Sequence, residues 1–421
     1  MYSIVFADRV DETVAAMRSR AASANAAVEQ AVRAIFDDVK ENGYSAVEKY
    51  SLRFDGAAPR EIPPGKLEEA VSRCPRELID ALERSAANIR DYNEKLLPAG
   101  GMWLSPDGGR VGRVVRGLTR VGVYVPGGTA AYPSSVLMNV VPAKVAGVEE
   151  VVMVTPPTDH LNDAVLAAAR IAGVDRVIAV GGAQAVAALT FGAGFIPKVD
   201  KLVGPGNAYV AAAKRLAYGA LDIDMVAGPS EVLVIADETA DPAFVAADLL
   251  SQAEHDRLAS AVLLTTSEAL ARAVDAEMIR QTGYLERSEI MECSIRDFGV
   301  AVVCPTLEEC ARIANEIAPE HLEICTADPE GLLPSIRNAG AVFLGSWSPE
   351  PLGDYLAGPD HVLPTSGTAR FFSPLSVTSF LKTMSVIHYD RAALERVKDP
   401  IITLARSEGL TAHANSIEVR F

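Results

Sequence analysis

The sequence of 421 residues predicts an α/β fold built on parallel sheets. From about residue 121, short apolar runs rich in β-branched residues alternate with alanine-rich segments of helical periodicity. The same alternation recurs from about residue 242. Strands that are apolar along their whole length are buried on both faces, so this pattern is typical of parallel sheets covered by helices. We therefore expect two α/β units.

The elements are expected in the following order. Residues 1 to about 100 should be mainly helical, because Val28–Val39 and Leu67–Asn93 carry apolar residues three and four positions apart. The first unit should have strands at 150–155, 176–180, 201–203 and 232–236 and helices at 161–172, 183–190 and 207–218. The second should have helices at 242–255, 268–280 and 307–317 and strands at 259–265, 300–304 and 341–345. Residues 353–376 should form an ordered functional loop, and 377–421 a mostly helical tail.

Composition and charge exclude several classes of protein. Apolar residues make up 49% and charged residues 22%, which is typical of a globular chain. Lys and Arg number 39 against 55 Asp and Glu, and the net charge of −16 argues against nucleic acid as a partner. The uncharged stretches 121–143 and 177–197 are interrupted by Pro and Gly, so neither should span a membrane. Five cysteines without a C-x-x-C pair, and no secretory signal, predict a cytoplasmic protein.

A candidate metal site lies near the start of the second unit. Asp241 followed by Pro242 is a typical helix start, and Gln252 and His255 lie three positions apart on one face of that helix. Helical pairs at this spacing can present metal ligands. A solvated polar face explains the same residues equally well, so both interpretations stay open.

Three further segments carry groups suited to proton transfer or metal binding. The adjacent Glu320 and His321 could serve two proton-transfer steps, although a second Glu-His dipeptide in the chain indicates that chance can also produce one. Asp354 and His361 lie in the glycine-rich loop, where turn capping is the alternative. His413 lies in the tail, where a histidine is usually solvated.

No G-x-G-x-x-G motif follows a strand in this sequence. Gly181-Gly182 and Gly204-Pro205-Gly206 each follow an expected strand and precede a helix, which would let backbone N–H groups approach a phosphate. Tight strand–helix turns use glycine for other reasons as well. The residues alone therefore indicate an α/β enzyme with a candidate metal site of His and carboxylate ligands, and leave the substrate open.

Several runs together resemble the histidinol dehydrogenase family over nearly the whole chain. They include Val-Gly-Val-Tyr-Val-Pro-Gly-Gly (121–128), Gly-Pro-Gly-Asn (204–207), Ser-Gln-Ala-Glu-His-Asp (251–256), Ala-Pro-Glu-His-Leu-Glu (318–323) and Gly-Leu-Thr-Ala-His-Ala (409–414). The resemblance implies a zinc-dependent oxidoreductase that converts L-histidinol to L-histidine through an aldehyde with two NAD. These are the final steps of histidine biosynthesis.

The resemblance also implies a role for each site residue. The implied zinc ligands are Gln252, His255, Asp354 and His413, and imidazole and oxygen donors suit Zn²⁺. His321 is implied to take the hydroxyl proton of the substrate, and Glu320 to activate the water that attacks the aldehyde. The implied substrate contacts are Ser230, Gln252, His255, His321, Asp354, Glu408 and His413, and the implied NAD contacts are Tyr124, Gln184 and Asn207.

The architecture implied by the resemblance is two Rossmann-like domains with parallel sheets, one inserted in the other, plus small helical terminal segments. We expect a helical segment at 1–20, a discontinuous domain at 21–123 and 234–376 that carries the zinc and catalytic residues, an inserted NAD-binding domain at 124–233, and a helical tail at 377–421. Family members form intertwined homodimers. Glu408 and His413 are therefore expected to reach the active site of a partner subunit.

One position departs from the family pattern. Asp360 precedes His361 where a neutral residue such as Asn or Ser is expected, and it either caps the loop or adds negative charge near the zinc. The alternative function is a related zinc and NAD dehydrogenase that acts on another small polar alcohol. A zinc hydrolase would lack its usual H-E-x-x-H pattern here, and a non-catalytic binding protein would have no use for the full set of catalytic residues.

Overall fold

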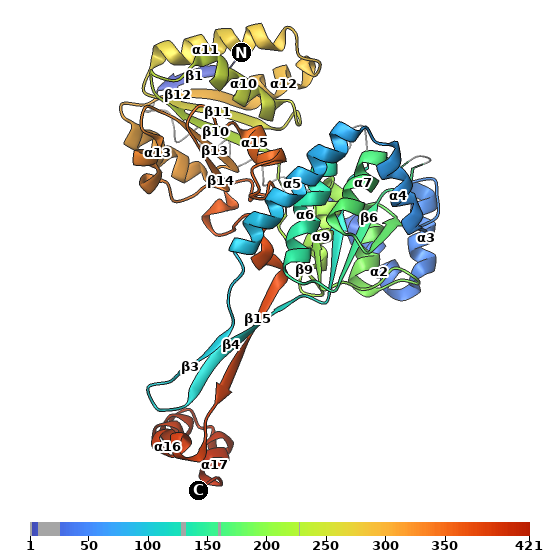
Figure 1. The fold of residues 1–421 in the computed structure, drawn as a ribbon, viewed down its shortest axis with the longest axis vertical. Coiled ribbons are helices and arrows are strands. Elements are labelled where there is room, and N and C mark those ends of the chain that lie inside the picture. The colour runs from blue at the N-terminus through green and yellow to red at the C-terminus, as the bar shows by residue number, and fades with distance from the viewer. Residues whose placement is uncertain (1, 7–25, 128–131, 159–160, 227) are drawn as a thin grey trace.

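The computed structural model describes residues 2–6, 26–127, 132–158, 161–226 and 228–421. They form two globular α/β units and a long arm that projects from them and ends in helices (Figure 1). The chain enters one unit as an edge strand, passes through the whole of the other unit, and then returns to complete the first. Two parallel-sheet α/β units, one inserted in the other, are thereby confirmed.

One of the two units, which we call the β10 unit, is built on a six-stranded parallel sheet, which we call the β10 sheet. Its strands are, in spatial order, β1 (Ser3–Phe6), β12 (Gly299–Val303), β11 (Ser260–Thr265), β10 (Glu231–Ala236), β13 (His321–Cys325) and β14 (Ala341–Leu344). One face packs against α10 (Pro242–Ala253), α11 (Glu268–Thr282) and α12 (Ser288–Phe298), and the other against α13 (Leu307–Ile317) and the short α14 (Pro329–Leu332). The short helix α15 (Glu350–Tyr355) follows β14 and leads into the glycine-rich loop.

The other unit, which we call the β5 unit, is built on another six-stranded sheet, which we call the β5 sheet. Its spatial order is β2 (Arg60–Ile62), β7 (Arg176–Ala179), β6 (Glu150–Thr155), β5 (Arg120–Tyr124), β8 (Lys201–Val203) and β9 (Asp222–Ile223), with only β2 antiparallel among these strands. One face packs against α4 (Pro64–Arg73), α5 (Arg76–Lys95), α6 (Pro133–Val145) and α7 (Asp163–Ala172), and the other against α2 (Ala26–Asn42), α3 (Tyr44–Phe54), α8 (Gly182–Phe191) and α9 (Ala208–Ala217). Because β6 and β8 lie on opposite sides of β5, the chain switches direction across the sheet at β5.

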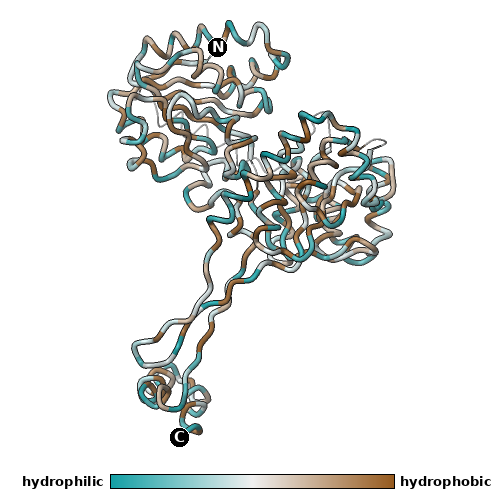
Figure 2. The backbone as a smooth tube through the Cα atoms, viewed as in Figure 1, coloured by the Kyte–Doolittle hydropathy of each residue, from teal (hydrophilic) through white to brown (hydrophobic). Residues whose placement is uncertain are grey.

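The arm is a three-stranded antiparallel ribbon of β3 (Gly101–Leu104), β4 (Arg110–Gly117) and β15 (Leu381–His388). At its tip lie α16 (Arg391–Ser407) and α17 (Thr411–Glu418) (Figure 1). Hydrophobic and hydrophilic residues are interspersed along the arm (Figure 2). The strands of the arm were not anticipated, because residues 101–117 have no buried face whose periodicity could identify them.

The expected domain boundaries differ from the contacts observed. We assigned residues 21–123 to the unit with the catalytic residues, but α2 to α5 pack on the β5 sheet and β2 pairs with β7. Strand β10 begins at Glu231, inside the expected NAD-binding domain, yet belongs to the other sheet. Periodicity identifies which face of a helix is buried and does not identify the sheet that covers it.

Both terminal segments also differ from the expected helices. Residues 3–6 of the expected helical segment form β1, which pairs in parallel with β12, and residues 7–20 lie outside the described residues. The tail at 377–421 begins with a 3₁₀ turn (Val377–Phe380) and β15, and is helical only from Arg391. Strand β15 forms because it pairs with β4 along its whole length, a contact that local sequence cannot reveal. Among the helices that the structure describes, none is long and apolar enough to cross a membrane.

Candidate active site

A cavity of about 370 Å³ lies where the two units meet. The β10 unit contributes Ser230, just before β10, and Glu320 and His321 at the start of β13. The β5 unit contributes the turn Gly204-Pro205-Gly206 after β8. The expected catalytic residues and most of the expected substrate contacts therefore share one cavity.

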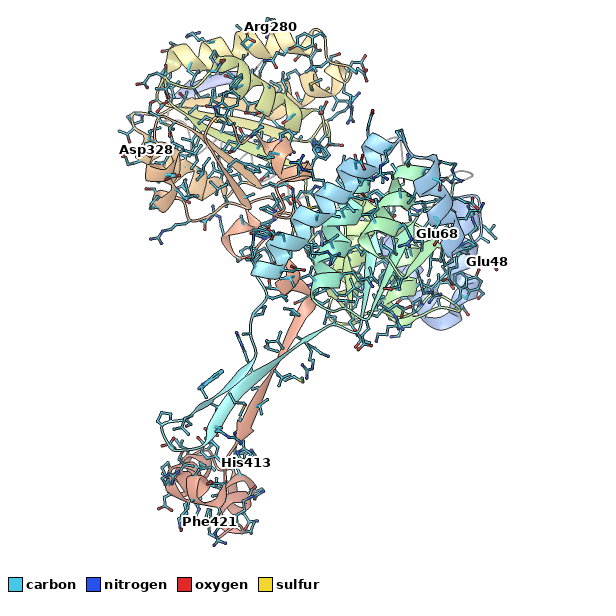
Figure 3. All side chains as sticks on the ribbon, in the orientation of Figure 1. Glu48, Glu68, Arg280, Asp328, His413 and Phe421 are labelled. Carbon is cyan, nitrogen blue, oxygen red and sulfur yellow. The ribbon has the colours of Figure 1, made fainter. Side chains whose placement is uncertain are left out.

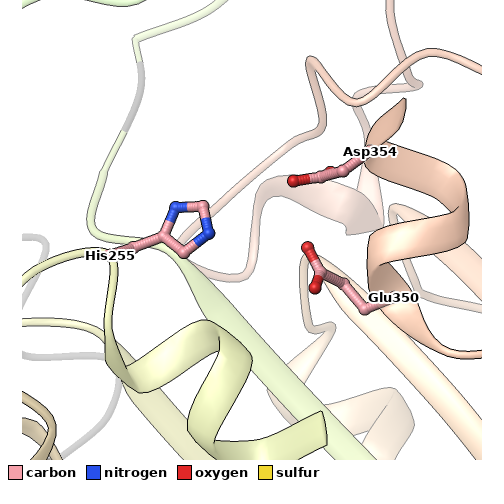
Figure 4. Close-up of side chains that lie close together, drawn as sticks. All are labelled: His255, Glu350 and Asp354. Atoms are coloured by element: carbon pink, nitrogen blue, oxygen red, sulfur yellow. The ribbon is translucent and has the colours of Figure 1, made fainter. Parts of the chain in front are cut away.

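Three side chains in this cavity are close enough to hold one metal ion. One ligand atom from each of His255, Glu350 and Asp354 lies within 4.8 Å of the others (Figure 4). Glu350 and Asp354 lie one turn apart on α15, whereas His255 follows the end of α10. Gln252, on the last turn of α10, lines the same cavity, and its buried Oε1 has no hydrogen-bond partner among the described residues.

The donor set fits a zinc ion. An imidazole nitrogen together with carboxylate and amide oxygens matches the borderline ligand preference of Zn²⁺. Buried polar atoms are normally hydrogen-bonded. The Oε1 atoms of Gln252 and Glu350 have no partner among the described residues, which indicates that a bound ion or ligand completes this site. Burial and the neighbouring Asp354 raise the pKa of Glu350 to about 8.

Glu350 is a site residue that sequence reasoning missed. It lies four positions before Asp354, on a helix opened by Pro349, so the spacing of the two carboxylates was visible in the sequence. The segment was not expected to be helical because it is short and rich in Gly and Pro. The signal therefore existed and was weak.

His321 is oriented by one hydrogen bond. Its Nδ1 lies 3.0 Å from the carbonyl oxygen of Glu231, and because a carbonyl only accepts, Nδ1 carries the hydrogen. Nε2 is then a bare acceptor; it is buried, has no hydrogen-bond partner among the described residues, and lies 3.9 Å from Glu350 Oε1. Burial lowers the pKa of His321 to about 4, although Asp354 opposes the shift. The imidazole is therefore neutral near pH 7 and able to accept a proton.

Glu320 is held by the same backbone segment as His321. Its Oε2 accepts the N–H of Glu231 at 2.9 Å and lies 3.7 Å from His321 Nδ1. Burial raises the pKa of Glu320 well above its usual range, against this hydrogen bond. A carboxylate with a raised pKa is a stronger base than a free one.

The two expected site residues in the tail are not brought to the cavity within one chain. Glu408 ends α16 and His413 lies on α17; both are exposed. Figure 3 places His413 at the far end of the arm, away from both globular units. If these residues act at the site, they must act in another copy of the chain.

The three expected NAD contacts line a second cavity, of about 790 Å³. Tyr124 ends β5, Gln184 lies on α8 and Asn207 caps α9, so the cavity lies at the carboxyl edge of the β5 sheet, where the strand order switches. Ligands of open α/β sheets bind in this position. Pro126 lines both cavities, which places them next to each other.

The backbone is tightly packed between the two cavities, where Gly204 of the first cavity meets Tyr124 of the second. Gly204 has φ +106°, and a Cβ there would lie 2.2 Å from the carbonyl oxygen of Tyr124, so only glycine fits. The hydroxyl of Tyr124 accepts the N–H of Gly182 at 3.0 Å. Residues of α2 and α3, including Tyr50 and Arg53, also line this cavity, and sequence reasoning missed them because it assigned those helices to the other unit.

Asp360 caps the loop, which is one of the two roles considered for it. Its Oδ1 accepts the N–H of Val362 at 2.8 Å, while Oδ2 is buried without a hydrogen-bond partner among the described residues. Burial raises the pKa of Asp360 well above its usual range, and Asp224 and Asp354 add to this effect. Next to it, His361 lines the first cavity, and its Nδ1 lies 3.1 Å from the carbonyl oxygen of Asp354.

Comparison with known proteins extends these observations. A sequence model described as histidinol dehydrogenase matches residues 18–421. The chain is 51% identical to the histidinol dehydrogenase of Clostridium acetobutylicum over 96% of this chain and 95% of that protein. It is 52% identical to that of Bacillus subtilis over 92% of each chain. The crystal structure of histidinol dehydrogenase from Elizabethkingia anophelis superposes with a TM-score of 0.95 at 34% identity, covering 100% of this chain and 98% of that one.

The fold and the site together define an α/β enzyme with a buried imidazole–carboxyl pair beside a candidate metal centre. The family match covers most of the chain, and the curated relatives are similar over nearly their full length. The chain belongs to the histidinol dehydrogenase family, and it is an oxidoreductase.

Proposed function

We propose that this chain is a zinc-dependent dehydrogenase that oxidises L-histidinol to L-histidine in two successive NAD-linked steps through histidinal. The observation that carries the proposal is that His321, whose buried Nε2 has no hydrogen-bond partner among the described residues, lines the same cavity as His255, Asp354 and Gln252. A proton acceptor and a metal donor set therefore face one substrate. The relatives are named histidinol dehydrogenases, which supports histidinol as the substrate.

The zinc ion would be held by Gln252, His255 and Asp354, with His413 supplied by a second copy. Glu350 belongs to the same cluster and lies close enough to ligate or to orient the other donors. Bound zinc would supply a fixed positive charge that holds the nitrogen atoms of the substrate and orients its hydroxyl group.

In the first oxidation, His321 Nε2 accepts the proton of the substrate hydroxyl while the carbon-bound hydrogen leaves with its electron pair as hydride. The bond from Nδ1 to the carbonyl of Glu231 keeps the imidazole oriented as the proton arrives. NAD, bound in the adjoining cavity, would supply the hydride acceptor in both oxidations.

In the second oxidation, Glu320 takes a proton from the water that attacks the aldehyde. Because Glu320 holds that proton, the adduct is the singly ionised diol, which then loses a hydride and one further proton to give the carboxylate. Burial raises the pKa of Glu320, so its ionised form is a stronger base for this step than a free carboxylate. Ser230 and Glu408 are expected to contact the substrate, and an acidic Glu408 suits a cationic amino alcohol.

The NAD molecule is proposed to contact Tyr124, Gln184 and Asn207. All three line the cavity at the switch point of the β5 sheet, and that cavity adjoins the substrate cavity at Pro126. This arrangement would bring the nicotinamide ring to the substrate without a complete G-x-G-x-x-G motif.

The active enzyme is proposed to be an intertwined homodimer. The arm holds α16, which Glu408 ends, away from the globular units of its own chain (Figure 1). His413 on α17 lies at the same far end (Figure 3), so a second copy is required for both residues to reach a site. A cytoplasmic location is also proposed, and five cysteines that are all free thiols support it.

The test is a count of NADH formed per L-histidinol by zinc-loaded protein. Two NADH per substrate, lost on chelation of the metal, are expected. One NADH would remove the aldehyde step and the role of Glu320. No NADH from folded, zinc-loaded protein would favour the alternative function, a related zinc and NAD dehydrogenase that acts on another small polar alcohol.

A further inference from the structure

Two carboxyl groups, the buried Glu323 and the half-buried Asp248, lie next to the elements that carry the metal donors. Glu323, on β13, is 1% exposed, and its side chain projects from the same face of the strand as His321 because the two lie two positions apart. Its Oε1 accepts the N–H of Glu350 at 2.8 Å, which is the first N–H of α15. The carboxyl of Glu323 is also hydrogen-bonded to the carboxyl of Asp248.

Asp248 belongs to the helix that carries the other donors. It lies on α10 four positions before Gln252, so both side chains project from one face of that helix. Ser251 adds a second link, because its hydroxyl lies 2.8 Å from the carbonyl oxygen of Asp248 and 3.2 Å from Glu350 Oε2. The strand with the base and both helices with the metal donors therefore converge on this pair.

We propose that Glu323 and Asp248 are positioning residues that hold α10, β13 and α15 in the arrangement that binds zinc. This inference deepens the proposed function and rests on it. Glu323 fixes the first turn of α15, and through it Glu350 and Asp354. Asp248 fixes the register of α10, and through it Gln252 and His255.

The chemistry of the pair supports a role beyond packing. Two carboxyl groups can bond to each other only if one of them keeps a proton, so the pair cannot be fully ionised while this bond is made. Burying such a pair is costly, and apolar side chains of similar size usually fill a core more favourably. Residues that hydrogen-bond to metal ligands are typically kept in spite of such a cost, because mutating them weakens metal affinity by about 10–100-fold.

The experiment measures zinc binding and not catalysis. Chelator-treated protein is titrated with zinc ions alone, in competition with a chromophoric chelator. Glu323→Ala removes both hydrogen bonds, and we expect it to weaken zinc affinity by about tenfold or more. Glu323→Gln should restore affinity close to the wild-type value, because its amide can accept from Glu350 N–H and donate to Asp248. Absorption spectra of Co²⁺-loaded proteins should change for Glu323→Ala and not for Glu323→Gln.

Asp237 provides the matched control. It is a buried carboxylate at the end of β10 that accepts the backbone N–H of Ala327 at 2.8 Å, and it lines neither cavity. Asp237→Ala should lower thermal stability and leave zinc affinity unchanged. If Asp237→Ala weakens zinc binding as much as Glu323→Ala, the effect is general destabilisation and the inference is wrong.

The other outcomes also separate the two proposals. Wild-type zinc affinity in Glu323→Ala overturns the inference alone, whereas a wild-type protein that takes up no zinc overturns the proposed function and the inference together. If Glu323→Ala does not fold, Asp248→Ala serves instead, because it leaves the bond from Glu350 N–H in place. Weaker zinc binding by Asp248→Ala supports the inference, and unchanged binding overturns it.

Discussion

The imidazole of His321 depends on its surroundings for its state of protonation. Burial lowers its pKa to about 4, so the folded protein binds fewer protons there than the unfolded chain between about pH 4 and the usual histidine value. Above this pH window the ring is neutral in both states and does not change the free energy of unfolding. As the pH falls through the window, the unfolded chain takes up the proton first, so the free energy of unfolding decreases.

The first prediction is that the His321 ring does not protonate between pH 5.5 and 9. ¹⁵N NMR of histidine-labelled, metal-free protein should give a constant His321 Nε2 shift across this range. A titration midpoint of His321 near pH 6.5, the ordinary histidine value, would contradict the lowered pKa that burial gives this residue.

The second prediction concerns Asp360. Because burial raises its pKa, the folded protein holds a proton there that the unfolded chain releases at neutral pH, so stability falls as the pH rises above the carboxyl range. Asp360→Asn can still accept the N–H of Val362 and cannot ionise. The free energy of unfolding should therefore increase at pH 7.5, by about 1.4 kcal/mol for each unit of raised pKa, and the gain should vanish near pH 4.

Urea unfolding at the two pH values measures this difference. Asp237→Asn is the control, because its effect on the free energy of unfolding at pH 7.5 should have the opposite sign. Burial alone would raise the pKa of Asp237, but hydrogen bonds from Thr239 and Ala327 outweigh it and lower the pKa, so this variant should lose stability at pH 7.5. Equal effects of the two substitutions would refute the assignment of Asp360.

At the scale of the elements, two helices begin with an asparagine cap, and only one of these caps lies beside the proposed NAD cavity. Comparing the two caps distinguishes an effect on cofactor binding from an effect on stability. The side chain of Asn207 accepts the N–H groups of Tyr209 and Val210 at the start of α9, beside the proposed NAD cavity. Asn162 caps α7 in the same way but lies on the opposite face of the β5 sheet and lines neither cavity.

The third prediction follows from this pair. Asn207→Ala and Asn162→Ala should each lose about 1 kcal/mol of unfolding free energy, because each loses a helix cap. Only Asn207→Ala should also raise the KM for NAD. Steady-state kinetics with variable NAD and thermal unfolding measure the two effects, and a similar rise in KM for Asn162→Ala would argue against the proposed cavity.

The elements also differ in how far sequence could predict them. The strands β6, β7 and β8 were predicted within about one residue, because central parallel strands are apolar along their whole length. Strands β3 and β4 of the arm were not predicted, because they are largely exposed and β4 pairs with β15 across more than 250 positions of sequence. Long-range pairing of this kind leaves no local periodicity.

Site residues followed the same rule. Gln252, His255 and Asp354 share a cavity as expected, and their roles were implied by resemblance to a family and not by spacing. Glu350 was missed because a single turn of helix in a Gly- and Pro-rich segment gives too short a pattern. Glu323 and Asp248 could not be paired from sequence, because a buried carboxyl looks the same in sequence as a solvated one.

For the whole molecule, the arm makes a decisive test of subunit exchange possible. His321→Asn inactivates the body of a chain, and His413→Ala inactivates its tail. If tails cross, a mixed dimer has one intact site, formed by a normal body and the partner's normal tail. If each tail serves its own body, a mixed dimer has none.

The fourth prediction is therefore complementation. Co-expression of the two variants in equal amounts should restore about a quarter of wild-type activity, because half of the dimers are mixed and each has one of two sites intact. Each variant alone should lose activity by about 10²-fold or more. No recovery in purified mixed dimers, separated by two affinity tags, would rule out crossing tails.

The insertion of one unit into the other also sets an order of events during synthesis. All six strands of the β5 sheet lie within residues 60–223, whereas β1 pairs with β12, nearly 300 residues later. A ribosome that has released the first 230 residues has therefore delivered the complete β5 sheet, whereas β1 still lacks β12 and β4 of the arm still lacks β15. The β5 sheet can form while β1 waits, and the β10 sheet can close only after β14 has been made.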